Sequence, residues 1–143
     1  MKLSIREDRT IPLPELLRLY GSVGWVNYTA RPERLEAALR GSLTVLGAWA
    51  EAEDGSETLV GIARAVGDGC TIVFIQDILV LPEYQRQGVG TALVREVLKR
   101  RGDVYQIELA TDREERTLGF YRSLGFTEFS DMGCAGFMKL NPL

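Results

Sequence analysis

The sequence has 143 residues, of which 45% are apolar, and this suits a single domain over residues 1–143 with one core. It holds 17 Lys and Arg against 20 Asp and Glu, and the net charge of −3 gives no basic surface for a nucleic-acid backbone. It has no histidine, which excludes Ser-His-Asp triads, Cys-His pairs and His-ligated metals. We therefore expect no nucleic-acid partner and no metal, and acid–base chemistry from Asp, Glu, Tyr, Cys, Lys or water.

Nothing in the sequence indicates export or a membrane partner. The first nine residues lack the apolar run of a signal peptide, and the longest apolar runs, 72–75 and 78–81, have the length of strands. Cys70 and Cys134 form no C-x-x-C pair, so neither a metal site nor a disulfide framework is indicated. We expect a cytoplasmic protein.

The first forty residues predict one short strand and two short helices. Residues 2–6 have the pattern of a strand. Apolar residues at helical spacing predict helices over 12–20 and 32–39, each followed by a glycine. The loop between them, 21–28, is rich in aromatic residues.

From residue 42 the apolar period changes to that of strands. Three strands joined by short glycine turns predict an antiparallel meander, and a helix–strand–helix pattern with two further strands follows it. The expected strands are 43–49, 59–66, 71–81, 104–110, 126–129 and 134–140, and the expected helices are 88–101 and 114–124. This order predicts an α/β (α+β) fold, with a mixed sheet of six to seven strands and about four helices on both faces.

The most specific feature is the turn that opens the helix over 88–101. Gly88 and Gly90 lie where the first N–H groups of that helix are unpaired and favour an anion, and without a Cβ the backbone can approach a phosphate closely. A dinucleotide-binding turn would have Gly or Ala where Leu93 stands, and the Gly-Lys-Ser/Thr of a P-loop is absent. The alternative is that the glycines only tighten a strand-to-helix corner.

The segment Gln85-x-x-Gly88-x-Gly90 resembles the Q/R-x-x-G-x-G/A pyrophosphate loop of the GNAT superfamily of N-acetyltransferases. The resemblance extends to the preceding strand, 77–82, and to residues 120–126. Shorter matches, among them Val23-Gly24-Trp25, are similar to a bacterial subgroup that resembles the plant plastid serotonin/arylalkylamine N-acetyltransferases. The resemblance implies a GNAT fold and transfer of an acetyl group from acetyl-CoA to a primary amine.

The same resemblance implies how acetyl-CoA binds. The loop residues would hold its pyrophosphate: Gln85, Arg86, Gln87, Gly88, Val89, Gly90 and Thr91. The backbone of Ile78, Leu79 and Val80 would pair with the pantetheine arm, where the fourth strand splays from the fifth, and an N–H of Leu79 or Val80 would stabilise the oxyanion. The alternative for these residues is an ordinary buried strand.

Tyr121 stands where GNAT enzymes commonly have a tyrosine that protonates the departing CoA thiolate. A phenol with an ordinary pKa of about 10 is protonated at neutral pH and can donate its proton. Packing beside Phe120 and Phe126 is the alternative role.

Asp77 is a lone carboxylate within an apolar strand, and strands seldom bury one without a partner. It is a candidate general base, an anchor for the acceptor's ammonium group, or a structural hydrogen-bond acceptor. Asp112 and Glu114 are further base candidates, although acidic residues also favour the start of a helix. Glu114 replaces an Asn that is common in the family, which departs from the usual pantetheine contact.

The resemblance places Trp25 and Tyr28 in the loop that covers the acceptor pocket, where their rings could bind an aryl group or a cation. The alternative is that both rings pack into the core and anchor the loop. We therefore expect acetyl transfer to a small amine by direct attack in a ternary complex, without a metal, and from the resemblance a homodimer. The alternative is a non-catalytic CoA-binding regulatory module.

Overall fold

The first part of the chain forms a sheet with helices on both of its faces. The computed structural model describes residues 2–142, which divide into one unit that ends at Leu109 and a second that begins at Ala110. The strands of the first unit are β1 (Lys2–Glu7), β2 (Thr44–Glu51), β3 (Glu57–Gly67), β4 (Ile72–Val80) and β5 (Gln106–Leu109). Its helices are α1 (Leu13–Ser22), α2 (Val26–Thr29), α3 (Pro32–Gly41), the 3-10 helix η1 (Pro82–Tyr84) and α4 (Val89–Arg100).

The five strands form one mixed sheet in the order β1-β2-β3-β4-β5. Neighbouring strands among the first four pair antiparallel, and β2, β3 and β4 follow one another directly as a meander. Helices α1 to α3 lie between β1 and β2 in the chain. β5 is parallel to β4, and α4 makes the crossover between them. The expected mixed sheet, with an antiparallel meander followed by β-α-β, is confirmed.

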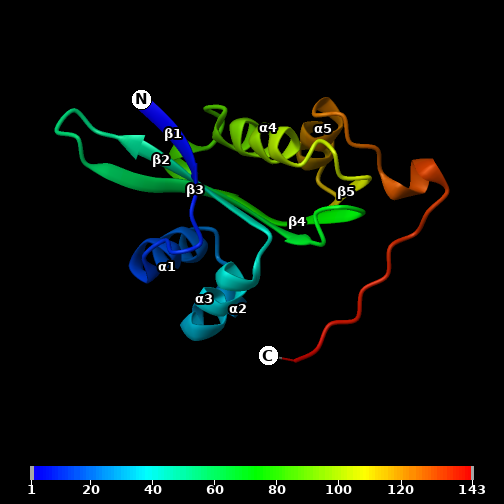
Figure 1. Cartoon of the computed structure of the whole chain (residues 1–143), viewed down its shortest axis with the longest axis horizontal. Helices are drawn as coiled ribbons and strands as arrows, with labels where there is room; N and C mark the ends of the chain where they lie inside the picture. The colour runs from blue at the N-terminus through cyan, green and yellow to red at the C-terminus, as the bar shows by residue number, and fades with distance from the viewer. Residues whose placement is uncertain (1, 143) are drawn as a thin grey trace. The chain divides into compact units, whose positions relative to one another are not determined.

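The apolar faces of the helices account for the core. In Figure 1, α1 and α3 lie on one face of the sheet and α4 lies on the other. Leu16 and Leu19 of α1 and Leu93 and Val97 of α4 are fully buried. These four residues stand at spacings that place them on one side of their helices, so each helix buries a single stripe against the sheet.

A β-bulge interrupts β4 where it stops pairing with β5. Arg64 of β3 pairs with Asp77, but the next residue of β3 pairs with Ile75, so Gln76 is the extra residue. The parallel pairing with β5 also ends at Ile75, opposite Leu109. Within the described residues, 77–80 of β4 therefore pair with β3 alone, and their second edge is open, as expected for strands that separate.

The second unit contains α5 (Glu115–Ser123) and the 3-10 helix η2 (Phe129–Met132). Tyr121 packs edge-on against Phe120 and Phe126, with ring centroids 4.9 Å and 5.9 Å apart. These contacts fix the last turn of α5 against the residues that follow it. The unit thus has its own small aromatic cluster.

The expectation of six to seven strands is wrong for residues 2–142, which form five. The segment expected as a strand over 126–129 leads into η2, whose turn ends at Gly133 in the left-handed region, with φ 73°. Residues 134–140 form no ladder in the described structure, and a strand is stable only where its backbone groups are paired. Phe137 and Leu140 are consequently exposed, at 98% and 82%.

The helices differ from expectation in one place. The aromatic loop over 21–28 contains a single turn, α2, which the sequence did not predict, and this makes five α-helices in the described residues rather than about four. None of the described helices combines the length and the apolar character needed to cross a membrane.

Candidate active site

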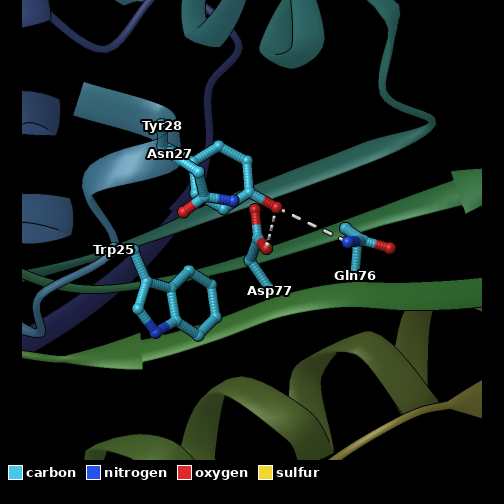
Figure 2. A pocket seen from close by; sticks show the side chains of 5 residues that line it. All are labelled: Trp25, Asn27, Tyr28, Gln76 and Asp77. Atoms are coloured by element: carbon cyan, nitrogen blue, oxygen red, sulfur yellow. Dashed lines mark hydrogen bonds between the residues drawn. The ribbon is translucent and has the colours of Figure 1, made fainter. Parts of the chain in front are cut away.

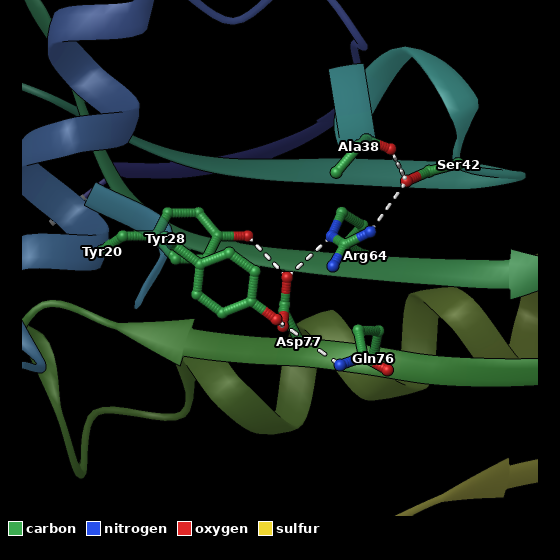
Figure 3. Close-up of polar contacts among 7 residues, drawn as sticks. All are labelled: Tyr20, Tyr28, Ala38, Ser42, Arg64, Gln76 and Asp77. Carbon is green, nitrogen blue, oxygen red and sulfur yellow. Dashed lines mark hydrogen bonds and ion pairs between the residues drawn. The ribbon is translucent and has the colours of Figure 1, made fainter. Parts of the chain in front are cut away.

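The carboxylate of Asp77 is the centre of a buried polar cluster (Figure 3). Arg64 Nε donates to its Oδ2 at 2.7 Å, and the Tyr20 hydroxyl donates to the same oxygen at 2.8 Å. The Tyr28 hydroxyl donates to Oδ1 at 3.2 Å. Asp77 is 1% exposed and Arg64 is 6% exposed. Of the three roles left open for Asp77, these contacts favour the structural acceptor, because an Arg and two phenols already hold the carboxylate.

The charges in this cluster are well compensated. Burial alone would lower the pKa of Arg64, but the Asp77 carboxylate outweighs it and raises that pKa, so the guanidinium stays charged. Burial and the same carboxylate raise the pKa of Tyr20. Arg64 Nη1 also donates to Ser42 Oγ at 3.3 Å, and the Ser42 hydroxyl donates to the carbonyl of Ala38, so α3 supports the cluster from its far side.

A pocket of about 290 Å³ opens above this cluster (Figure 2), lined by Trp25, Asn27, Tyr28, Gln76 and Asp77. The rings of Trp25 and Tyr28 are stacked, with centroids 5.7 Å apart and planes 27° apart. The structure therefore brings three predicted residues, Trp25, Tyr28 and Asp77, to one pocket. The turn α2 presents the aromatic wall, and the bulge in β4 supplies the opposite one.

The turn before α4 leaves backbone donors without protein partners. Gly88 caps the helix in the left-handed region, with φ 84°, and no side chain caps it. Ala92 is the first residue of the helix whose amide bonds back, to the carbonyl of Gly88. Among residues 2–142, no acceptor bonds the amides of Val89, Gly90 or Thr91. A Cβ on Gly88 would project into open space, which is where an anion would approach.

The rest of the predicted loop is shaped to keep that approach open. Arg86 adopts φ 61°, an uncommon left-handed conformation for a residue with a side chain. The side-chain amides of Gln85 and Gln87 donate to the carbonyls of Val80 and Glu83, at 3.1 Å and 3.0 Å. Both glutamines therefore brace the turn between β4 and α4.

The open edge of β4 leads directly into this loop. The amide of Leu81 donates to the carbonyl of Val60 on β3, and strand groups alternate from one edge to the other. The backbone groups of Ile78 and Val80 therefore face the open edge, whereas those of Leu79 face β3. Of the two amides predicted to stabilise an oxyanion, the one on Val80 has the suitable direction.

In the second unit, Tyr121 is half-buried on α5. Burial and the nearby Asp112 raise the pKa of its phenol, so it is protonated at neutral pH. No hydrogen bond of the Tyr121 hydroxyl occurs within residues 2–142. Asp112 Oδ1 accepts the amide of Glu114 at 3.0 Å, which is a helix-start contact. The described part of the chain holds no cluster of three or more His, Cys, Asp or Glu side chains suited to a metal ion.

Sequence reasoning missed three residues of the site: Arg64, Asn27 and Gln76. A signal for Arg64 was present, since a lone Arg in the apolar strand 59–66 and a lone Asp in the next strand can pair across a hairpin. Asn27 and Gln76 carried no such signal, because a one-turn helix and a bulge bring them to the pocket.

The family model "Acetyltransferase (GNAT) domain" matches residues 46–128, which is more than half of the chain. The chain belongs to the GNAT acetyltransferases. A curated relative, the N-acetyltransferase ycf52 of Porphyra purpurea, is 32% identical over 130 residues, covering 89% of this chain and 71% of that protein. The expected family is therefore confirmed, and its members named here are N-acetyltransferases.

Solved structures agree on the fold. A GNAT family acetyltransferase from Streptococcus pneumoniae has a TM-score of 0.83 and 41% identity, with 98% of each chain covered. The PaiA N-acetyltransferase of Thermoplasma acidophilum, determined in complex with coenzyme A, has a TM-score of 0.67 and 20% identity, covering 89% of this chain and 91% of that one. The second likeness shows the fold alone.

Proposed function

We propose that this GNAT protein transfers the acetyl group of acetyl-CoA to the primary amine of a small acceptor, by direct attack in a ternary complex. One observation carries the proposal: the unpaired amides of Val89, Gly90 and Thr91 adjoin a strand edge that is also unpaired. A chain that leaves both sets of donors free in one place is suited to a long ligand with an anionic end and an amide-bearing arm. The CoA bound to the Thermoplasma protein of the same fold supports this choice of ligand.

In this proposal the pyrophosphate of acetyl-CoA accepts hydrogen bonds from the amides of residues 86–91, and Arg86 adds a positive charge. The braced side chains of Gln85 and Gln87 hold the loop in its binding shape. The pantetheine arm pairs with the open edge of β4 through the backbone of Ile78 and Val80, as an added strand does. Leu79 packs inward and supports that edge, since its side chain is buried.

The reaction joins the acceptor nitrogen to the acetyl carbonyl carbon and breaks the carbon–sulfur bond of the thioester. The amide of Val80 points to the open edge and is our candidate donor to the oxyanion that forms during attack. Tyr121 is our candidate acid: its phenol gives a proton to the departing thiolate and recovers one from water. The raised pKa of Tyr121 keeps the phenol protonated until that step.

The acceptor pocket supports a small molecule with an aryl or other flat body. Its volume is about 290 Å³, and the stacked rings of Trp25 and Tyr28 form one wall. A net charge of −3 argues against a nucleic acid as acceptor. We assign Asp77 the role of a positioning residue that orients Tyr28, in place of the general base, because Arg64 already neutralises it.

We also propose the cytoplasm as the compartment and a homodimer as the assembly. The first rests on the cysteine usage of the sequence, and the second on the family resemblance together with the exposed side chains of Phe137, Met138 and Leu140. Light scattering at working concentrations tests the dimer, and a monomer would remove it.

A thiol-release screen tests the proposed function. Purified protein with acetyl-CoA is offered arylalkylamines, polyamines, amino acids and peptide N-termini, and mass spectrometry confirms the acetylated product. We expect turnover with small arylalkylamines. If CoA raises the melting temperature but no amine is acetylated, the protein is the CoA-binding regulatory module instead. Turnover of histone-like peptides alone would overturn the small-molecule acceptor.

A further inference from the structure

The acceptor pocket contains one acidic side chain, and that acid is already paired. Of the five lining residues, only Asp77 carries a negative charge at neutral pH, since Asn27 and Gln76 are amides and Tyr28 is a phenol. Arg64, which is not one of the lining residues, contacts the Asp77 carboxylate at 2.7 Å (Figure 3). The two charges cancel, because −1 and +1 sum to zero.

The other ionisable groups that face Asp77 leave this balance unchanged. They are the phenols of Tyr20 from α1 and Tyr28 from α2. Burial keeps Tyr20 protonated, and hence neutral, well beyond neutral pH. An ammonium group that entered the pocket would therefore add a positive charge beside an ion pair that is already neutral as a whole.

Any water that an ammonium group loses against the rings of Trp25 and Tyr28 is a cost that no unpaired carboxylate of the pocket offsets, whereas an uncharged amine carries no such penalty. The pocket offers acceptors for the N–H bonds of a neutral amine: the side-chain oxygens of Asn27 and Gln76 and the hydroxyl of Tyr28. The Tyr28 hydroxyl donates its own proton to Asp77 Oδ1, so its lone pairs are directed elsewhere (Figure 2). Gln76 Nε2 donates to the Tyr28 hydroxyl oxygen at 3.5 Å, which leaves one lone pair of that oxygen for an incoming N–H.

We propose that the Arg64–Asp77 pair makes the pocket select the acceptor amine in its uncharged form, so that deprotonation precedes binding. This inference rests on the proposed acetyl transfer. The free base attacks the thioester, the nitrogen then loses one proton to water, and the phenol of Tyr121 gives one to the thiolate and regains it from water. The products are the amide and CoA thiol, and no protein base takes a net proton.

The pH dependence of kcat/KM tests this inference in the wild-type protein. The two acceptors are an arylethylamine that turns over in the screen and its β,β-difluoro analogue, which has almost the same shape and a much less basic amine. If the free base is selected, kcat/KM falls tenfold per pH unit below the pKa of each amine. The acid limb then shifts to lower pH with the analogue, by the full difference between the two amine pKa values.

If kcat/KM falls at the same acidic pH for both acceptors, the inference is overturned, because the fall then reports a titrating group of the protein. Matched inhibitors give a second readout: an aryl-ethyl-trimethylammonium ion and its uncharged tert-butyl isostere. We expect the uncharged compound to compete with the acceptor at least tenfold more tightly in wild-type protein. Equal or tighter competition by the cation would overturn the inference, since stacked aromatic rings can also attract a cation.

Two variants of Arg64 link the effect to its charge. Arg64→Lys keeps the positive charge and should retain the preference for the uncharged inhibitor, while Arg64→Gln exposes the Asp77 charge and should reverse it. Circular dichroism first establishes that both variants are folded, and the wild-type readouts stand without them. Absence of turnover with every amine overturns the proposed function itself, whereas turnover with a fixed acid limb overturns only this inference.

Discussion

The polar groups around Asp77 and those at the start of α4 differ in whether the protein itself pairs them. Both oxygens of Asp77 accept bonds from side chains of three other elements. The amides of Val89, Gly90 and Thr91, in contrast, have no acceptor within residues 2–142. The first amides of any helix lack an intrahelical acceptor, so those of α4 are open to water or to an anion. The first region is held together by its own side chains, and the second is where we propose that acetyl-CoA binds.

Three of the five tyrosines show the same contrast. The hydroxyls of Tyr20 and Tyr28 are both engaged with Asp77, whereas no bond of the Tyr121 hydroxyl occurs in the described residues. A phenol that is already donating to a carboxylate cannot give its proton to a leaving group without breaking that bond. This difference is why we propose Tyr121, and not Tyr20 or Tyr28, as the acid.

Replacement of Tyr121 by Phe should have the largest effect. It removes one hydroxyl and keeps the ring that packs between Phe120 and Phe126. If the phenol protonates the thiolate, kcat falls by about 10²–10⁴-fold, while the Kd for acetyl-CoA and the melting temperature stay close to those of the wild type. Steady-state kinetics and calorimetry measure both.

Tyr105→Phe is the matched control, because that tyrosine is 85% exposed and lies outside the proposed machinery. It should leave kcat unchanged. Full kcat in the Tyr121→Phe protein, with the chemical step shown to limit turnover, would assign the residue to packing alone.

Removal of Arg64 breaks the ion pair at the centre of the Asp77 cluster. Arg64→Met leaves the Asp77 carboxylate buried without its countercharge, and breaking a buried pair in this way costs about 3–5 kcal/mol of the free energy of unfolding. Urea denaturation measures the loss. Adding Asp77→Asn to this variant should recover part of it, since no lone charge then remains.

The exposed Arg95 on α4 provides the control, and Arg95→Met should change stability little. A loss below about 1 kcal/mol for Arg64→Met would show that water compensates Asp77. The pair would then be too weak to set the charge of the acceptor pocket.

Gly88→Val tests the loop before α4, and Gly55→Val is its matched control. Both glycines adopt φ 84°, and a Cβ would meet nothing within 4 Å at either position, so the backbone strain is matched. Only Gly88 directly precedes the unpaired amides at the start of α4. We expect the Kd for CoA to rise about 10- to 100-fold in Gly88→Val, the cost of one charge-assisted hydrogen bond, and to be unchanged in Gly55→Val.

Isothermal titration calorimetry gives both Kd values, and the CoA-dependent rise in melting temperature gives a second measure. Equal affinity in the two folded variants would contradict binding of the pyrophosphate at this loop.

The sequence predicted these two regions unequally well. The loop before α4 is local: Gln85, Gly88 and Gly90 lie within six residues, so their pattern predicted the turn and the helix start, while the ligand was implied by the family resemblance. The Asp77 cluster draws on α1, α2, β3 and β4, and which residues meet there depends on the register of the hairpin and on the bulge at Gln76. Period-2 patterning predicts strands but cannot place an extra residue.

The C-terminal strands failed for a related reason. Residues 134–140 have a composition compatible with a strand, yet a strand also needs an edge to pair with, and this is a property of the assembled structure. The helix α5 was predicted almost to its bounds because its hydrogen bonds are internal.

The smallest expected effect is a pH dependence of stability that belongs to Tyr20. Its pKa is raised in the folded protein by burial and by Asp77, so the folded state keeps the phenol proton after the unfolded chain, with a pKa of about 10, has released it. The contribution to stability is complete below pH 10 and is lost as the pH rises above that value, by up to about 1.4 kcal/mol per pH unit.

The Tyr20→Phe variant has no phenol proton to lose over this pH range. Urea denaturation from pH 8 to 11 should therefore show the wild type about 1–3 kcal/mol more stable than Tyr20→Phe at the lower end, with the gap closing above pH 10. Tyr105→Phe should follow the wild type throughout, because that hydroxyl is exposed in both states. A gap that stays constant to pH 11 would mean that the Tyr20 hydroxyl ionises as easily in the folded protein as in the unfolded chain, and the region around Asp77 would then be open to water.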